Sequence, residues 1–255
     1  MDLGIQNKVA LVMASSMGLG KAVAIELAAE GAKVVICGND QKSLDETLVE
    51  IQAFAPGRVT SFFCELTNEA HRKQLIEHSV KTFGDIEILI TNSGGPAAGP
   101  FEQFDLEDWR GFYDLLFISV VDIIKQVLPS MKQKQAGRIL AMTSVAVKQP
   151  ANNLISSNAV RTSVVGLVKS LSNEVAQYNI TVNNLMPGYT DTNRIKYLAE
   201  KDPTVYHIMD EIPMKRFAAT REFAAAAAFL VSERASYITG QSLAVDGGWI
   251  RGNCL

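Results

Sequence analysis

Short apolar runs alternate with longer stretches of helical periodicity along most of this chain. The apolar, β-branched runs predict strands at 9–13, 33–37, 59–65, 86–90, 138–142, 180–185 and 242–245. Between them, apolar positions recur at helical spacing and predict helices at about 21–30, 40–54, 67–82, 106–134, 156–177 and 222–232. Residues 193–216 form a separate, mostly helical excursion before the last of these helices.

This alternation predicts an α/β fold in which helices cover both faces of a parallel sheet. Right-handed crossovers would make it a Rossmann-like, doubly wound sheet that binds ligands at the carboxyl ends of its strands. The loops after the first, fourth, fifth and sixth strands are therefore expected to converge on one crevice. No linker-like stretch or internal repeat divides the chain, so we expect one domain over residues 1–255.

The stretch from Val9 to Ala22, VALVMASSMGLGKA, joins the first strand to the first helix. Small residues and two glycines, Gly18 and Gly20, precede a helical pattern that starts at Lys21. Helix N-termini attract anions, and small residues allow a pyrophosphate to approach the main chain. A glycine pair after a strand is also common in tight βα loops without a ligand. Taken alone, the stretch leaves a phosphate site and a plain turn both open.

Composition narrows the choice of partner and compartment. The formal net charge is −3 and the sequence pI about 5.7, which gives no electrostatic case for nucleic acid or an anionic membrane. No apolar run is long enough for a membrane span, and the N-terminal MDLGIQNK lacks a secretory pattern. Cys37, Cys64 and Cys254 have no metal-ligand spacing, and the first two fall in predicted strands. We therefore expect a reduced cytoplasmic protein without a metal site.

Further motifs follow the later predicted strands. They are TNSGG at 91–95, GRILAMTS at 137–144, ITVNNLMPGYTDT at 180–192 and ITGQSLAVDGGW at 238–249. Together with the first turn, and in this order, they make the chain resemble the short-chain dehydrogenase/reductase family over essentially its whole length. The resemblance is strongest to the 3-oxoacyl-[acyl-carrier-protein] reductases. It implies NAD(P)-dependent oxidation or reduction of a small carbonyl or hydroxyl compound, with the cofactor lying along the strand ends.

The resemblance also implies which residues hold the cofactor. They are Ser15, Ser16, Gly18 and Leu19 beside the pyrophosphate and ribose, Glu65 and Leu66 beside the adenine, Asn92 and Gly94 beneath the adenine-side ribose, and Pro187, Gly188 and Thr192 at the nicotinamide end.

Two cofactor positions depart from the family pattern. Ala14 replaces the first glycine of the turn, and Gly38 and Asn39 stand where the second strand ends. An acid at that end would accept from the ribose hydroxyl of NAD, whereas an arginine would pair with the 2′-phosphate of NADP. Asn39 is neither, and no acid at this position repels the phosphate. The sequence therefore leans slightly to NADP over NAD.

The catalytic positions depart further. In the family, a tyrosine protonates the carbonyl oxygen, a lysine four residues later lowers its pKa, a serine polarises the carbonyl and an asparagine completes a proton relay. Here Ser144 matches the serine, but Ser157, Arg161 and Leu116 replace the tyrosine, the lysine and the asparagine. A serine is a far poorer acid than a phenol of pKa about 10, and an arginine stays protonated. Ser144, Ser157 and Arg161 therefore form a donor cluster rather than an obvious proton relay.

Three functions remain open. The chain is an active oxidoreductase with an atypical catalytic set, a nucleotide-binding or regulatory homologue without hydride chemistry, or a scaffold without a cofactor. TNSGG and PGYTDT weigh against the scaffold, and we favour the oxidoreductase. Replacement acids would come from nearby loops and helices, at Tyr113, Lys148, Tyr189, Tyr206 or His207.

The remaining expectations concern assembly and substrate access. Family members are commonly tetramers, and the apolar faces of 115–128 and 156–175 suit a homotetramer or homodimer. The alanine-rich stretch 223–230 predicts close packing against the sheet or a neighbouring subunit. Residues 193–216 resemble the family's substrate lid, but their mixed sequence does not identify a substrate.

Overall fold

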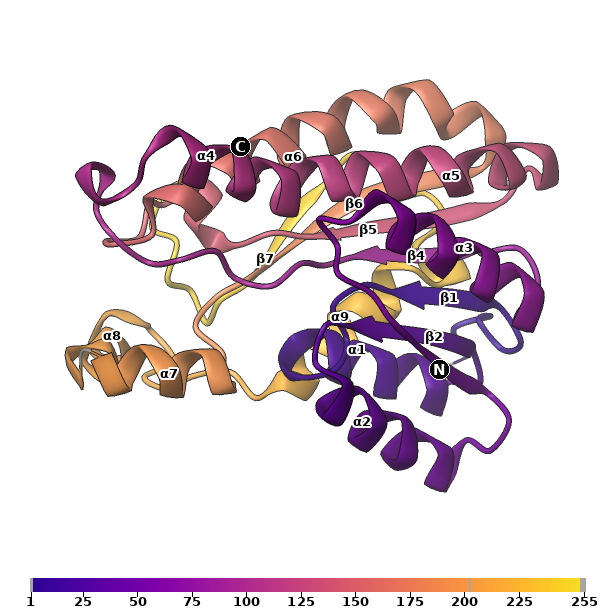
Figure 1. Ribbon diagram of the computed structural model, residues 1–255, viewed down its shortest axis with the longest axis horizontal. Helices are drawn as coiled ribbons and strands as arrows, with labels where there is room; N and C mark the ends of the chain where they lie inside the picture. Colours follow the sequence, from indigo (N-terminus) through magenta and orange to yellow (C-terminus); the bar gives the residue numbers. More distant parts are fainter. Residues whose placement is uncertain (1, 202, 253–255) are drawn as a thin grey trace.

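A computed structural model describes residues 2–201 and 203–252 and contains one seven-stranded parallel sheet of order β3-β2-β1-β4-β5-β6-β7 (Figure 1). The strands are β1 (Val9–Val12), β2 (Lys33–Gly38), β3 (Val59–Phe63), β4 (Ile88–Thr91), β5 (Gly137–Met142), β6 (Ile180–Pro187) and β7 (Ser242–Val245). The chain winds outward from β1 to β3, returns to β4 beside β1, and continues to β7. This confirms the predicted Rossmann-like, doubly wound sheet, whose strand order reverses between β1 and β4.

The helices connect these strands. They are α1 (Gly18–Ala29), α2 (Gln41–Phe54), α3 (Glu69–Phe83), α4 (Leu106–Tyr113), α5 (Ser119–Lys134), α6 (Ile155–Val175), α7 (Asn193–Lys201), α8 (Ile208–Glu211) and α9 (Thr220–Leu230). Shorter turns are η1 (Phe101–Gln103), η3 (Val145–Val147), η4 (Ala176–Tyr178), η5 (Pro203–His207) and η6 (Glu233–Ala235), and η2 (Asp114–Ile118) is a π-helical turn.

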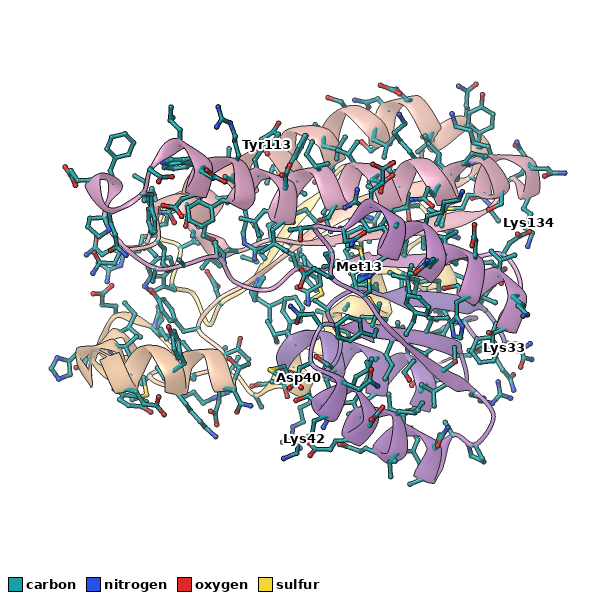
Figure 2. All side chains as sticks on the ribbon, viewed as in Figure 1. Met13, Lys33, Asp40, Lys42, Tyr113 and Lys134 are labelled. Atoms are coloured by element: carbon teal, nitrogen blue, oxygen red, sulfur yellow. The ribbon has the colours of Figure 1, made fainter. Side chains whose placement is uncertain are left out.

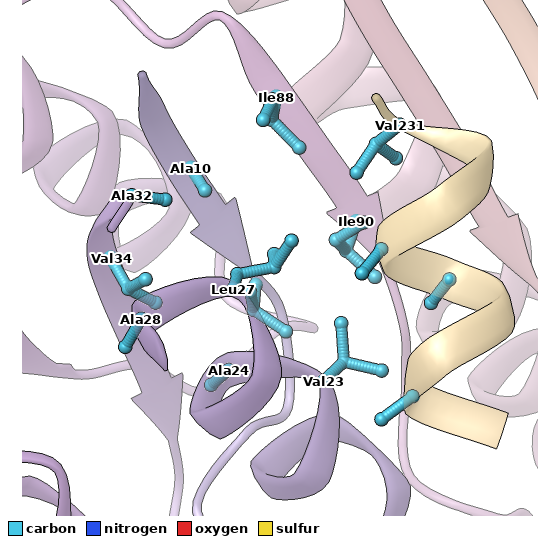
Figure 3. Close-up of a cluster of buried hydrophobic side chains, with 14 of the residues drawn as sticks. Ala10, Val23, Ala24, Leu27, Ala28, Ala32, Val34, Ile88, Ile90 and Val231 are labelled. Carbon is cyan, nitrogen blue, oxygen red and sulfur yellow. The ribbon is translucent and has the colours of Figure 1, made fainter. Parts of the chain in front are cut away.

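Alternation along the strands divides the core between the two faces of the sheet. In β1, Ala10 and Val12 join the cluster formed with α1, α2 and α9, whereas Val9 and Leu11 join the cluster formed with α3, α5 and α6. Figure 3 shows part of the first cluster, in which α1 and α9 pack side by side against one another and both contact strands of the sheet. Buried alanines on α9 allow this close approach, so the alanine-rich stretch packs within the chain. Because both faces are covered, most strand residues are buried and apolar, although β5 and β6 also bury Arg138, Asn183 and Asn184.

Several element boundaries differ from the expected ones. The first helix begins at Gly18 rather than Lys21, and Gly18 itself adopts a φ of +61°, which a residue with a side chain rarely adopts. β6 continues to Pro187 because β7 pairs with it as far as Val245. β3 ends at Phe63, which leaves Cys64 just beyond the strand. Apolar patterning does not reveal how far a hydrogen-bond ladder extends.

The helical stretch expected over 106–134 is present, but a π turn interrupts it. Over Asp114–Ile118 the helix takes one residue more per turn than a regular helix, and Ser119 donates its hydroxyl to the Leu115 carbonyl at 2.5 Å. Leu116, at the family's asparagine position, is buried here. Single π turns inside α-helices often mark functional sites.

The excursion over 193–216 contains α7, η5 and α8, as the sequence predicted, while Asp202 lies outside the described residues. In Figure 1, α7 and α8 stand to one side of the helical layers. Ile212 packs with Val145, Met186 and Trp249 in a small cluster of its own, which anchors the excursion to the strand ends. In the part of the chain described, no helix has the length and apolar character that crossing a bilayer requires.

Candidate functional site

A cleft of about 790 Å³ lies at the carboxyl ends of the strands. The loops after β1, β4, β5 and β6 converge on it, as expected, and the ends of β2 and β3 and helix α7 complete its walls. The predicted site residues that line it are Ser16, Gly18, Leu19, Asn39, Glu65, Leu66, Asn92, Gly94, Ser144, Ser157, Arg161, Pro187, Gly188 and Thr192. The structure therefore brings the predicted cofactor and catalytic residues together in one cavity.

Ser15 is the exception, because it is not among the residues that line the cleft. Its side chain is fully buried, and its hydroxyl donates to the Val12 carbonyl at 2.6 Å. The same oxygen accepts from the Cys37 amide at 3.0 Å. Ser15 thus fastens the turn after β1 to β2, so its hydroxyl is turned away from the cleft.

The turn after β1 is held by close backbone contacts. Ala14 adopts a φ of +45°, a region that residues with a Cβ seldom occupy. The Asn92 side chain donates to the Ala14 carbonyl at 3.0 Å. A Cβ added at Gly20 would lie 2.3 Å from the same carbonyl oxygen. The turn therefore requires glycine at position 20, whereas Ala14 keeps its methyl at the expense of backbone strain.

Two motif residues have structural roles besides any contact with a ligand. Asn92 fixes the Ala14 carbonyl, as described above. Gly188 lies against β7, where an added Cβ would come within 2.6 Å of the Asp246 Cα. Packing and hydrogen bonding within the protein therefore account for both residues.

The ends of β2 and β3 meet at one extremity of the cleft. Gly38 approaches the first turn so closely that an added Cβ would lie 2.7 Å from the Ser16 hydroxyl. The next residue, Asn39, donates its side-chain amide to the Glu65 carboxylate at 3.0 Å. Asn39 and Glu65 were each predicted as site residues, but their contact was not predicted, because 26 positions separate them in the sequence.

Arg161 forms the opposite wall and is nearly buried, with 8% of its surface exposed. Its Nε donates to the Ser157 hydroxyl at 3.2 Å, within α6. Its two terminal nitrogens donate to main-chain carbonyls, Nη1 to Met142 at 3.2 Å and Nη2 to Gly94 at 3.3 Å. One guanidinium thus joins α6 to the loop after β4 and to the end of β5.

Ser144 completes the predicted donor cluster. It lies two residues beyond the end of β5, and its hydroxyl accepts from the Ala146 amide at 3.1 Å, capping η3. That bond uses an oxygen lone pair and leaves the hydroxyl hydrogen to donate elsewhere.

Charge is unevenly distributed along the cleft. Among the described residues that line it, only Glu65 and Arg161 are charged at neutral pH. Glu65 follows the edge strand β3, whereas Arg161 contacts the ends of β4 and β5, and β2 and β1 lie between the two. The cavity therefore has a negative end and a positive end.

Of the replacement acids proposed from sequence, Tyr189 is the one that lines the described part of the cleft; Tyr113, Lys148, Tyr206 and His207 do not. Tyr189 packs edge-on against Trp249, with ring centroids 5.4 Å apart. Burial, and secondarily the negative charge of Glu211, raises the pKa of the Tyr189 phenol. The phenol therefore stays protonated. Sequence reasoning missed Tyr197, which lines the cleft from α7 within the expected lid.

Comparison with known proteins gives a consistent family. The chain matches the family described as enoyl-(acyl carrier protein) reductase over residues 13–250. It is 34% identical over 245 residues to the rabbit (Oryctolagus cuniculus) dehydrogenase/reductase SDR family member 4, covering 96% of this chain and 94% of that one. It is 31% identical over 254 residues to the NADPH-dependent reductase BacG of Bacillus subtilis, covering 96% and 98%.

Solved structures agree. L-sorbose reductase from Gluconobacter frateurii, complexed with NADPH and L-sorbose, superposes with a TM-score of 0.93 and 29% identity, covering 99% of this chain and all of that one. A 7α-hydroxysteroid dehydrogenase complexed with NADH and 7-oxo glycochenodeoxycholic acid has a TM-score of 0.92 and 29% identity, covering 98% and 97%. Relatives of this fold thus bind either nicotinamide cofactor.

Proposed function

Because the chain belongs to the short-chain dehydrogenase/reductase family, we propose that it transfers a hydride between NAD(P)H and a small carbonyl or hydroxyl compound in this cleft. Ser144, Ser157 and Arg161 are the proposed catalytic set. The observation that carries the proposal is the placement of Arg161, which is fixed by hydrogen bonds where the loops after β4 and β5 meet. A cation held there lies beside both the cofactor residues and the two serines.

The shape of the cleft fits a dinucleotide. A Cβ added at Gly18 or Gly94 would meet no atom within 4 Å, and both glycines line the cavity. The empty space beside them is what a phosphate or a ribose would fill, and Gly18 begins α1, whose N-terminus favours an anion. Pro187, Gly188 and Thr192 line the nicotinamide end of the proposed site. The cofactor, when bound, supplies or accepts the hydride.

The chain's own groups act on the substrate oxygen. As hydride reaches a carbonyl carbon, negative charge develops on its oxygen, and fixed donors stabilise that charge. The hydroxyls of Ser144 and Ser157 and the Arg161 guanidinium are such donors. Arg161 cannot itself supply the proton, since a guanidinium stays charged. The proton that completes the alcohol comes from the Tyr189 phenol or from water.

The substrate is proposed to enter beneath the excursion over 193–216. Asn193, Ile195 and Tyr197 line the cleft from this segment, which is the support for a lid. We also infer that the protein forms a homodimer or homotetramer, because Leu106, Tyr113 and Ile118 expose apolar surface along the α4–α5 stretch.

We infer that the protein lies in the cytoplasm, where thiols stay reduced. Cys37 and Cys64 are free, buried thiols, and Cys254 lies outside the described residues.

A second function is a nucleotide-binding, regulatory homologue without hydride transfer. The same hydrogen bonds favour it, because Arg161 donors are directed to Gly94, Met142 and Ser157 within the protein. In this case the guanidinium is a structural clamp, and the missing tyrosine is not replaced.

Titration with NADH and with NADPH, followed by tryptophan fluorescence, separates these functions. Trp249 packs against Tyr189 of the cleft and is the expected reporter. Turnover should then be measured with a panel of carbonyl compounds that contains a 3-oxoacyl thioester, a ketose and a keto-steroid. Binding with turnover supports the oxidoreductase, at a rate about two to four orders of magnitude below a tyrosine-bearing relative. Binding without turnover supports the regulatory homologue, and no binding overturns both.

A further inference from the structure

The contact between Asn39 and Glu65 determines which hydrogen-bonding groups the end of β2 presents to a cofactor. An asparagine side chain has an NH2 group that donates and an oxygen that accepts. Here one N–H of the NH2 group donates to the Glu65 carboxylate at 3.0 Å. The amide is thereby oriented, and the acceptor oxygen is left for whatever lies beside β2. Without Glu65, the same side chain could turn and donate to a phosphate.

Glu65 is itself held in place. Thr67 directs its hydroxyl to the other carboxylate oxygen at 3.4 Å, and the Glu65 amide donates to His71 Nδ1 at 3.2 Å. The Arg72 guanidinium of α3 pairs with Asp122 and donates to the Leu66 carbonyl. In the described part of the chain, no ion pair joins the Glu65 carboxylate to α3.

The beginning of α2 adds no net positive charge. Asp40 occupies the N-cap position without a side-chain capping bond, and Figure 2 shows Asp40 and Lys42 next to one another there. The hydroxyl of Ser43 donates to the Asp40 carboxylate at 2.5 Å and lowers the pKa of that group, so it is ionised at neutral pH. The charges of Asp40 and Lys42 offset each other. Ser16 and Met17, from the first turn, are uncharged.

We propose that Glu65, acting through Asn39, makes this cleft prefer NADH to NADPH. The inference rests on the proposed function, because it concerns the adenosine end of the same cofactor site. Carboxylates at the end of the second strand accept from the ribose 2′-hydroxyl of NAD, whereas NADP requires a cation for its 2′-phosphate. In this chain the carboxylate comes from β3 instead, and the asparagine presents an acceptor. A 2′-hydroxyl can donate to either group, whereas a 2′-phosphate is repelled by the Glu65 carboxylate.

The test compares the dissociation constants of NADH and NADPH, which differ only in the 2′-phosphate, by tryptophan fluorescence. We expect the wild-type protein to bind NADH about tenfold more tightly or better, as one repelled charge near a protein surface implies. Glu65→Gln should bring NADPH affinity up by about tenfold, with NADH affinity changed about threefold at most. Glu46→Gln removes the same charge from an exposed position of α2 and should leave the ratio unchanged.

Salt provides an independent measurement. Charge repulsion at this half-exposed position is screened, so the NADH preference of the wild type should shrink as ionic strength rises. Equal or tighter binding of NADPH by the wild type overturns the inference and leaves the proposed function standing. So does an NADH preference that Glu65→Gln does not reduce. Failure of both nucleotides to bind overturns the proposed function together with this inference.

Discussion

At the β2–β3 end of the cleft a carboxylate, Glu65, is tied to an exposed amide, whereas at the β4–β5 end a guanidinium, Arg161, is tied to two main-chain carbonyls and a hydroxyl. The first pair lies at the surface, where solvent and salt weaken its field. The second group is buried, where electrostatic interactions are strong and lost hydrogen bonds are costly. We therefore propose that the positive end both takes part in the reaction and supports the structure. The negative end is expected to affect only the choice between NADH and NADPH.

The largest effect should follow from rebuilding the family's chemistry at the positive end. The triple variant Leu116→Asn, Ser157→Tyr, Arg161→Lys introduces the family's three missing residues. It places a phenol four residues before a lysine on α6 and an asparagine in the π turn. We expect the reductase rate to rise by about 10²- to 10⁴-fold, the range that a positioned acid supplies. Steady-state rates with NADH and NADPH over the carbonyl panel measure it. A folded variant without any gain would show that the wall around Ser144 no longer accommodates the relay.

Arg161→Ala should remove both the positive charge and the hydrogen bonds at the β4–β5 end of the cleft. It leaves the Gly94 and Met142 carbonyls without their donor, at about 1–3 kcal/mol for each buried group. We expect the free energy of unfolding to fall by about 3 kcal/mol and cofactor affinity to fall by tenfold or more. Urea unfolding and fluorescence titration measure the two effects. The matched variant Arg161→Lys keeps the charge without the planar fork. Unchanged stability and affinity in Arg161→Ala would contradict the clamp.

Tyr189→Phe tests whether a phenol serves the positive end. The ring contacts with Trp249 and Phe217 are retained, and only the hydroxyl is removed. If the phenol donates the proton, the reduction rate should fall by at least about tenfold. Because burial raises the Tyr189 pKa above its ordinary value of 10.0, the phenol remains a donor at higher pH than an exposed tyrosine. The wild-type rate should therefore decline only on the alkaline side of pH 10.0, and the variant should lack that decline. An unchanged rate assigns the proton to water.

Ala14→Gly should have the smallest effect and concerns the turn between the two ends. Glycine adopts the φ of +45° without strain, so we expect the free energy of unfolding to rise by about 0.5 kcal/mol. Loss of the methyl group also widens the cleft where Ala14 lines it. Thermal unfolding measures the change, and Ala14→Ser, which keeps a Cβ, should show no gain. Destabilisation by glycine would mean that the methyl contributes packing that outweighs the strain.

Much of the fold could be predicted because apolar periodicity and glycine placement act locally. The strands 9–13 and 242–245 and the convergence of four loops follow from such patterns. The Asn39–Glu65 contact could not be predicted, because it depends on the relative placement of two strand ends and on one side-chain orientation. The hydrogen bonds of Arg161 to main-chain carbonyls could not be predicted either, because every residue has such a carbonyl. Ser15 shows the converse, since its place in a motif suggested a ligand contact while its hydroxyl is used inside the turn.

The π turn over Asp114–Ile118 sets the rotational phase of the helical stretch that contains it. Each residue of an α-helix advances the chain by about 100° around the axis, so one extra residue in a regular helix would rotate all of α4 by about that angle relative to α5. Gly111 would then leave the cleft wall, and the exposed Leu106 and the edge-on pair of Trp109 and Phe112 would face new directions. The wide turn takes up the extra residue and keeps the two helices in phase, so it links the shape of the cavity to the outer surface of the protein.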